Sequence, residues 1–335
     1  MEEEKKLYPF RFCTLEDTYV WGSEEFRLAD LGYRDSLIHD GWLAANTMGE
    51  VMDMYMDRVV GENVFTFWGR QFPVCVRILK VKGRMPLRVH PDDTLASDRY
   101  DFLGKEKLWY VVRAGKDAKL MIGFRKDADA TLLYEKCLDN SVEDILNVIA
   151  PQAGQSFLIP SGTPHAAAGD IVIAEISESS PLDFCLCTWG QEISEEEFDE
   201  SLNLVDALDF INYNRYSAPT VAQSSKIGRT LADIDQFNVV ELNLKDTLFS
   251  RSGQFDSFIL YQCVKGEASV QLEVLGQKVD YRFKAGETVL VPAECPDFYL
   301  VPLAAGTAVL EVTIPFRTDH DAYINPSAAP TLPED

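Results

Sequence analysis

The sequence GQSFLIPSGTPH, residues 154–165, decides the fold, because GETVLVPAECPD at residues 286–297 repeats its pattern. In both segments a glycine precedes five residues of strand-like sequence, and a proline ends them. The two glycines are 132 residues apart, and so are the two prolines. A proline that ends a strand at the same point twice places His165 and Asp297 at equivalent positions. The repeat therefore predicts a duplicated β domain.

Most apolar segments are short, rich in Val, Ile, Phe and Tyr, and bounded by Gly or Pro, which is typical of strands in an all-β protein. They form two sets: residues 72–81, 107–112, 118–124, 156–159, 171–176 and 183–189, and then residues 237–244, 257–264, 268–275, 279–283, 288–291 and 308–314. A polar stretch containing Pro219 separates the sets. We therefore predict two domains, residues 1–220 with the candidate site and some helices, and residues 221–335.

Two helices are expected among the strands. Ser194 and Glu197 form a capping-box pattern, and apolar residues follow at helical spacing as far as Ile211. A second helix is expected over residues 141–149, where apolar residues recur on one side. Both helices are predicted to be packing elements.

Composition limits the function classes. Over 335 residues, Lys and Arg number 31 against 54 Asp and Glu, which gives a net charge of −23. This charge disfavours nucleic acid as a partner, whereas a local basic pocket can still bind a small phosphate. No stretch has the roughly 18 consecutive apolar residues that span a bilayer, and the first residues lack a signal-peptide pattern, so we expect a cytoplasmic protein without a membrane partner. The seven cysteines include no C-x-x-C and are expected to be reduced core thiols.

A second motif lies upstream in PLRVHPDD, residues 86–93, where Arg88 and His90 are two apart and so share a strand face. With the segment at residues 154–165, it resembles the paired motifs of the cupin superfamily. Five pieces together resemble the type I mannose-6-phosphate isomerases (phosphomannose isomerases) over about residues 20–190: Trp21-Gly22, RVHPDD, GKEKLWYVV from Gly104, IPSGTPHA from Ile159 and AEISESS from Ala174. The resemblance implies a mainly β fold with two cupin-type (jelly-roll) β-barrels and a few helices, the C-terminal barrel being degenerate.

The resemblance implies a metal site that this sequence alters. The family holds zinc with a Gln and a His two apart, a Glu in a G-K-x-E segment and a later His. His90 and His165 match, but Arg88 stands at the Gln position and Lys107 at the Glu position. Neither cation normally ligates a metal, and the exchange adds about three positive charges, so zinc or another divalent metal is possible but weakened. The histidines are alternatively satisfied by hydrogen bonds inside the barrel.

The resemblance also implies catalytic residues and an activity. Glu175 and Lys105 match the family's catalytic glutamate and lysine, whereas Cys185 stands where the family has an arginine. Arg88 and Lys107 are expected either to bind substrate or to pair with a carboxylate such as Glu175. The expected function is aldose–ketose isomerisation in carbohydrate metabolism, interconverting mannose 6-phosphate and fructose 6-phosphate. A non-catalytic cupin that binds a sugar or sugar phosphate is the alternative, and an isomerase or epimerase that works without metal is a third. The expected partner is a small phosphorylated sugar.

Overall fold

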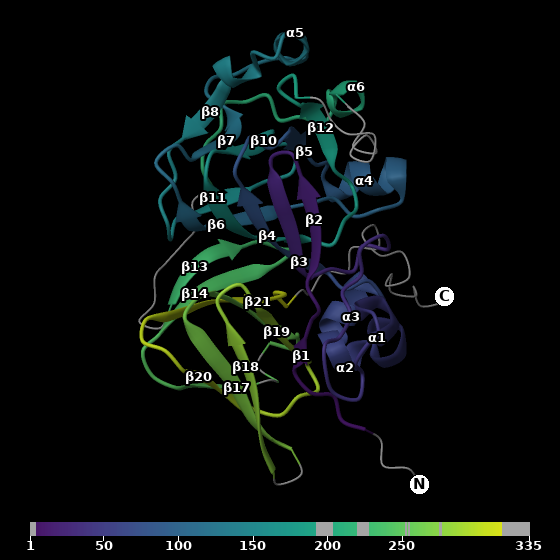
Figure 1. Ribbon diagram of the computed structural model, residues 1–335. Coiled ribbons are helices and arrows are strands. Elements are labelled where there is room, and N and C mark those ends of the chain that lie inside the picture. Colours follow the sequence, from purple (N-terminus) through teal and green to yellow (C-terminus); the bar gives the residue numbers. More distant parts are fainter. Residues whose placement is uncertain are drawn as a thin grey trace, which may run out of the picture. The chain divides into compact units, whose positions relative to one another are not determined.

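The computed structural model describes residues 5–191, 204–219, 228–251, 253, 255–274 and 277–316. The chain divides into two compact units. One, here called the site unit, comprises Glu16–Phe26 and Arg77–Thr220, and the other, the companion unit, comprises Met1–Leu15, Arg27–Val76 and Val221–Asp335. In Figure 1 most strands of the site unit are blue to teal, and β13 to β21 of the companion unit are green to yellow. The division near residue 220 stays a prediction.

The strands that lie wholly or partly in the site unit form two sheets over the described residues. The first has the order β12-β5-β10-β7-β8, with β5 (Leu87–Val89), β7 (Lys119–Phe124), β8 (Leu146–Ile149), β10 (His165–Ala168) and β12 (Phe184–Cys187). The second has the order β2-β3-β4-β11-β6-β9, with β2 (Leu15–Tyr19), β3 (Gly22–Leu28), β4 (Val74–Val81), β6 (Lys107–Ala114), β9 (Ser156–Ile159) and β11 (Ile171–Glu178). Its helices are α4 (Asp93–Tyr100), α5 (Ala130–Leu138), the 3-10 helix η1 (Val142–Asp144) and α6 (Leu204–Ala207).

Strand pairing brings the motif residues together. Arg88 on β5 is opposite His165 on β10 on one side and Cys185 on β12 on the other. In the second sheet, antiparallel pairing of β6 with β11 sets Trp109 opposite Glu175. Motifs that are about 75 residues apart in sequence (residues 90 and 165) therefore meet through hydrogen-bonded neighbours.

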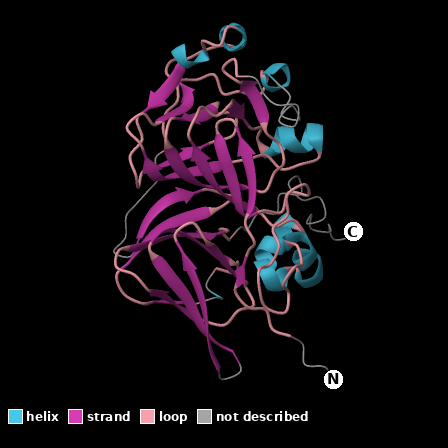
Figure 2. Ribbon diagram, in the orientation of Figure 1, coloured by secondary structure: helices cyan, strands magenta, loops and turns pink. Residues whose placement is uncertain are grey.

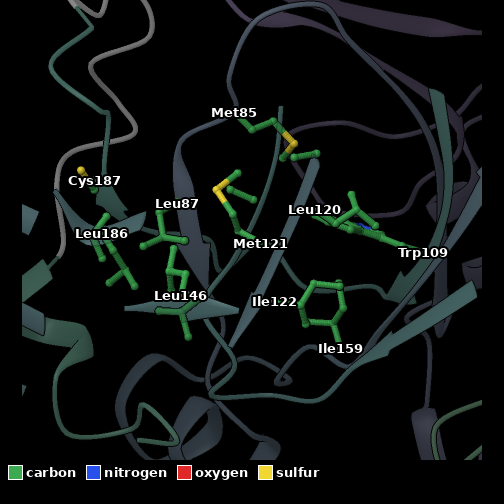
Figure 3. Packing of buried hydrophobic residues seen from close by; sticks show 14 of the residues in the cluster. Met85, Leu87, Trp109, Leu120, Met121, Ile122, Leu146, Ile159, Leu186 and Cys187 are labelled. Carbon is green, nitrogen blue, oxygen red and sulfur yellow. The ribbon is translucent and has the colours of Figure 1, made fainter. Parts of the chain in front are cut away.

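Buried apolar side chains from both sheets of the site unit form one core. Figure 3 shows part of it, with Leu87 and Leu120 from the first sheet and Trp109 and Ile159 from the second. Each of these side chains is at most 1% exposed. The strands carry apolar residues on the face that meets the other sheet, which explains why the sequence favours Val, Ile, Leu and aromatic residues there.

The companion unit repeats this arrangement of strands. Its sheets have the orders β1-β19-β16-β21-β14-β13 and β15-β20-β17-β18 among the residues described. The strands are β1 (Phe10–Arg11), β13 (Gly228–Asp233), β14 (Asn238–Leu244), β15 (Leu248–Ser250), β16 (Ile259–Lys265), β17 (Glu267–Val274), β18 (Gln277–Lys284), β19 (Thr288–Val291), β20 (Phe298–Pro302) and β21 (Thr307–Thr313). Three helices, α1 (Met48–Tyr55), α2 (Asp57–Val60) and α3 (Glu62–Trp68), lie next to one another (Figure 1).

The duplicated turn has the same local structure in both copies. Gly154 and Gly286 have φ of 84° and 89°, in the region that glycine adopts without steric cost. Each is followed by a four-residue strand, β9 or β19, and the strands begin at Ser156 and Thr288. His165 then opens β10. The repeat in the sequence thus corresponds to a repeat in the structure.

The mainly β fold is confirmed, and strands make up most of the described regular structure (Figure 2). The helix expected over residues 141–149 is wrong: η1 gives way to β8, which pairs with β7. Ser141 makes no side-chain cap, and the apolar residues after it serve the sheet edge instead. The start of the helix expected from Ser194 lies outside the described residues, and α6 lies within its predicted span. No described helix has both the length and the apolar character required to cross a bilayer.

Candidate functional site

His90 and His165 lie side by side in the site unit, with ring centroids 5.0 Å apart. The Nδ1 atom of His90 is 3.1 Å from the carbonyl oxygen of Leu182, and that of His165 is 2.8 Å from the carbonyl oxygen of Thr163. A carbonyl only accepts, so each Nδ1 carries the hydrogen and each Nε2 has a free lone pair. Both Nε2 atoms are buried without a hydrogen-bond partner among the described residues.

The charge state of these rings follows from their surroundings. Burial is the main cause that lowers both imidazole pKa values, and the positive charge of Lys107 adds to it. The pKa of His165 falls to about 3. Both rings are therefore neutral near pH 7, and each presents one acceptor nitrogen inside the protein.

Glu175 lies at the centre of a group of donors. It accepts hydrogen bonds from Arg77 Nε at 2.8 Å and Trp109 Nε1 at 2.6 Å, and Lys107 Nζ lies 3.5 Å from Oε2. Burial alone would raise the pKa of Glu175, but the charges of Arg77 and Lys107 outweigh it and hold the pKa well below the usual range. The carboxylate is thus ionised and saturated with partners.

Arg88 belongs to a second set of ion pairs. Its Nη1 lies 2.9 Å from Glu24 Oε1 and 3.4 Å from Asp183 Oδ2. The other oxygen of Glu24 accepts from Arg77 at 2.6 Å, so Glu24 bridges the two arginines. Burial would raise the pKa of Asp183, but Arg88, followed by Lys107 and Lys105, lowers it below the usual range.

Lys105 and Lys107 are 5% and 2% exposed, which is unusual for lysines. Burial is the main cause that lowers both ammonium pKa values, and that of Lys105 falls to about 7. Lys107 pairs with Glu175, whereas Lys105 forms no ion pair with the described residues. We call these side chains the buried charge network: Glu24, Arg77, Arg88, Lys105, Lys107, Glu175 and Asp183.

Glu106 and Glu178 are turned to other partners. Glu106 accepts from the backbone N–H of Ser161 at 3.0 Å and from its hydroxyl at 2.9 Å. Glu178 accepts from the backbone N–H of Glu106 at 2.8 Å. Burial raises the pKa of both carboxyls. Glu106 therefore does not take the ligand position that Lys107 occupies, as side-chain alternation along a strand predicts.

The side chains present fit a divalent metal ion only in part. The free Nε2 lone pairs of His90 and His165 are suitable zinc ligands. Within the described part of the chain, however, no group of three or more His, Cys, Asp and Glu side chains is placed to hold an ion. Arg88 and Lys107 stand where further ligands are expected, and the nearby carboxylates already bind them. The donor set does not fit a zinc site with three or four protein ligands.

The structure brings together every residue that the sequence identified for the site: Arg88, His90, Lys105, Lys107, His165 and Glu175. The roles assigned to them stay predictions. Sequence reasoning missed Glu24, Arg77 and Asp183. One signal was present, since Arg77 is a charged residue in the apolar strand VCVRILKV, which is buried at nearly every position. A cation in such a strand needs a buried anion.

The chain is similar in sequence to proteins named as mannose-6-phosphate isomerases. No family model matches the chain. The mannose-6-phosphate isomerase ManA of Bacillus subtilis is 24% identical over 317 residues, which cover 87% of this chain and 95% of that protein. A mannose-6-phosphate isomerase of Streptococcus mutans is 22% identical over 224 residues, covering 66% of this chain and 68% of its own.

Solved structures show the same fold. The mannose 6-phosphate isomerase from Bacillus subtilis aligns with a TM-score of 0.77 at 18% identity, over 91% of this chain and 99% of that one. A putative mannosephosphate isomerase from Archaeoglobus fulgidus aligns with a TM-score of 0.71 at 19% identity, over 94% of this chain and 100% of that one.

Proposed function

We propose that this chain, which belongs to the type I mannose-6-phosphate isomerase family, is an aldose–ketose isomerase that interconverts mannose 6-phosphate and fructose 6-phosphate. The observation that carries the proposal is a pair of neutral histidines, His90 and His165, at the positions of the family motifs and next to the buried charge network. The proposal includes the cupin-type barrel for each of the two domains, residues 1–220 and 221–335. It also includes a small phosphorylated sugar as the substrate class.

The reaction moves one proton between neighbouring carbons. A base takes the proton from C2 of the open-chain aldose, the C–H electron pair forms the C1–C2 double bond, and the former carbonyl oxygen O1 becomes negative. The proton on O2 then moves to O1, which becomes a hydroxyl group, and the base returns its proton to C1 as the C2=O double bond forms. This gives the ketose, so no oxidant or reductant is needed. The site must supply a base and must stabilise the negative oxygen.

Lys105 fits the role of the base. Its ammonium is buried and forms no ion pair with a described carboxylate, and burial moves its pKa to about 7, where the amine and the ammonium are both populated. A group with this pKa both takes and returns a proton near neutral pH.

Arg88 and Lys107 fit the stabilisation of negative oxygen or of the phosphate, because both are cations fixed in place by carboxylates. Glu175 already accepts from three donors and is therefore a poor base. Its contacts favour a role in which Glu175 positions Arg77, Lys107 and Trp109. A catalytic role for Glu175 itself stays a prediction.

The residues expected to hold a metal are His90 and His165. Because the donors around them do not complete a metal site, no step of the reaction is assigned to a metal here. Their free Nε2 atoms serve instead as acceptors for substrate hydroxyl groups.

The test is NMR of mannose 6-phosphate and fructose 6-phosphate in D2O with the purified protein. We expect interconversion with deuterium at C2 of the aldose and C1 of the ketose, and loss of both signals in Lys105→Gln. Lys119→Gln is the matched control, because Lys119 is a half-exposed lysine paired with Glu143 at the surface. Absence of deuterium exchange into either sugar, in buffers with and without zinc, would contradict the proposal.

A further inference from the structure

We infer that the positive charge which a divalent ion would supply at this site comes from Lys107 and Arg88, so the chain works without a bound metal. This inference rests on the proposed isomerase function for its chemistry. Its statement about metal binding is testable without any activity.

Trp109 connects the Lys107 ion pair with the histidines. Its Nε1 donates to Glu175, the carboxylate that pairs with Lys107, and its ring centroid lies 5.3 Å from that of His165, which is 5.0 Å from that of His90. Glu175 fixes the Lys107 ammonium at 3.5 Å, and Arg77 and Trp109 fix Glu175 in turn. The cation is thus held by the protein at the position where the family places a metal-binding carboxylate.

The balance of charge excludes an additional cation. The network sets four cations, Arg77, Arg88, Lys105 and Lys107, against three carboxylates, Glu24, Glu175 and Asp183, which leaves one positive charge when both lysines are protonated. A divalent ion would raise this to three positive charges in a site almost closed to water. Repulsion between like charges is strong where solvent screening is weak.

Coordination of a metal by the carboxylates would carry a second free-energy cost, because they would have to leave their present partners. Glu24 bridges Arg77 and Arg88, and Glu175 accepts from Arg77, Trp109 and Lys107. Release of either carboxylate to a metal would leave buried cations without a partner, which is costly. Among the described residues, this leaves only the two histidines as metal ligands, and two ligands are too few for tight zinc binding.

The experiment compares the metal content of the protein with that of a variant that carries the family's ligand residues at positions 88 and 107. The protein and Arg88→Gln/Lys107→Glu are each dialysed against zinc and then against buffer, and zinc is measured by elemental analysis. We expect less than about 0.1 zinc per chain in the unchanged protein and about one per chain in the double variant, since the latter restores two ligand positions. Circular dichroism reports whether the variant is folded.

A control variant separates site chemistry from total charge. Arg84→Gln/Lys119→Glu makes the same change in charge, at two cations that both pair with Glu143 outside the network. We expect it to bind no more zinc than the unchanged protein. Equal zinc uptake by the two double variants would overturn the inference, as would a folded Arg88→Gln/Lys107→Glu protein that binds none.

A second measurement does not depend on the folding of any variant. If the unchanged protein retains about one zinc per chain that histidine modification by diethyl pyrocarbonate releases, the inference is wrong. Activity then separates the two proposals. Turnover that persists in chelator supports both proposals. Turnover that requires zinc supports the isomerase function and contradicts the metal-free site. A protein that neither binds zinc nor exchanges deuterium supports the argument from charge and contradicts the isomerase function.

Discussion

Replacing Glu175 with Gln tests whether the buried charge network depends on one ionised carboxylate. The change keeps the shape of the side chain but removes the negative charge that faces Arg77 and Lys107, both under 10% exposed. Removal of one partner from a buried ion pair typically costs about 3–5 kcal/mol, because the remaining charge is left without compensation. We expect Glu175→Gln to lower the free energy of unfolding by about this amount at pH 7, measured by urea denaturation.

Glu178 provides a matched control on the same strand. It is 1% exposed, against 0% for Glu175, but its pKa is raised by burial, whereas the charges of Arg77 and Lys107 lower the pKa of Glu175. The raised pKa favours the neutral acid, which Gln resembles in charge and shape, so Glu178→Gln is expected to cost less than about 1 kcal/mol. Both variants are compared by the shift of the urea midpoint at constant slope. Equal destabilisation by the two variants would refute the assignment of Glu175 as the charged partner.

Three further predictions concern pH and backbone geometry. Burial raises the pKa of Asp30 to about 6, so the folded state binds a proton more tightly and stability falls as pH rises from about 4 to about 6. In Asp30→Asn, which can still accept from Phe72 N–H, this fall of up to about 2 kcal/mol should vanish from thermal melts at several pH values. For isomerisation, kcat/KM is expected to rise with pH through an apparent pKa of about 7, because the proposed base is the neutral amine of Lys105. Lys105→Gln should lose this rise with pH and reduce the rate about 10²- to 10⁴-fold. Gly22 has a φ of 148°, and an added Cβ would overlap the carbonyl oxygen of Lys80, so Gly22→Ala should lower the free energy of unfolding by about 2–3 kcal/mol, and an unchanged melting temperature would contradict this.

The strands were predictable because their physical cause is local. β-branched and aromatic residues between turn residues favour extended chain, and the glycine and proline repeat showed the duplication. The helices were harder to predict. Helix α4 buries only Ala96, so its sequence DTLASDRY carries no apolar periodicity. Residues 141–149 do carry it, but nine residues are too few to separate a helix from a turn followed by a strand, and pairing with β7 decides the outcome.

The candidate site was predictable only where a motif exists. Arg88, His90 and His165 lie in two short motifs, so the sequence identified them. Glu24 and Asp183 lie outside every motif and reach the site only through strand pairing and tertiary contact, which a single sequence does not show. The resemblance to the isomerase family implied that two cations stand at metal-ligand positions, and buried cations in turn require carboxylates to balance them.

The two cations can replace much of the attraction that a metal would exert on a negative oxygen. With an effective dielectric constant of about 20, a divalent ion about 2 Å from a unit negative charge gains about 17 kcal/mol, and one lysine or arginine at about 2.8 Å gains about 6 kcal/mol. Lys107 and Arg88 together would then supply about two thirds of the attraction of the metal. Their carboxylate partners reduce this further, since Glu24 and Glu175 already neutralise part of the charge. A site of this kind stabilises the enediolate less than a metal does, so it depends more strongly on a base of matched pKa. Lys105, with a pKa of about 7, meets that requirement.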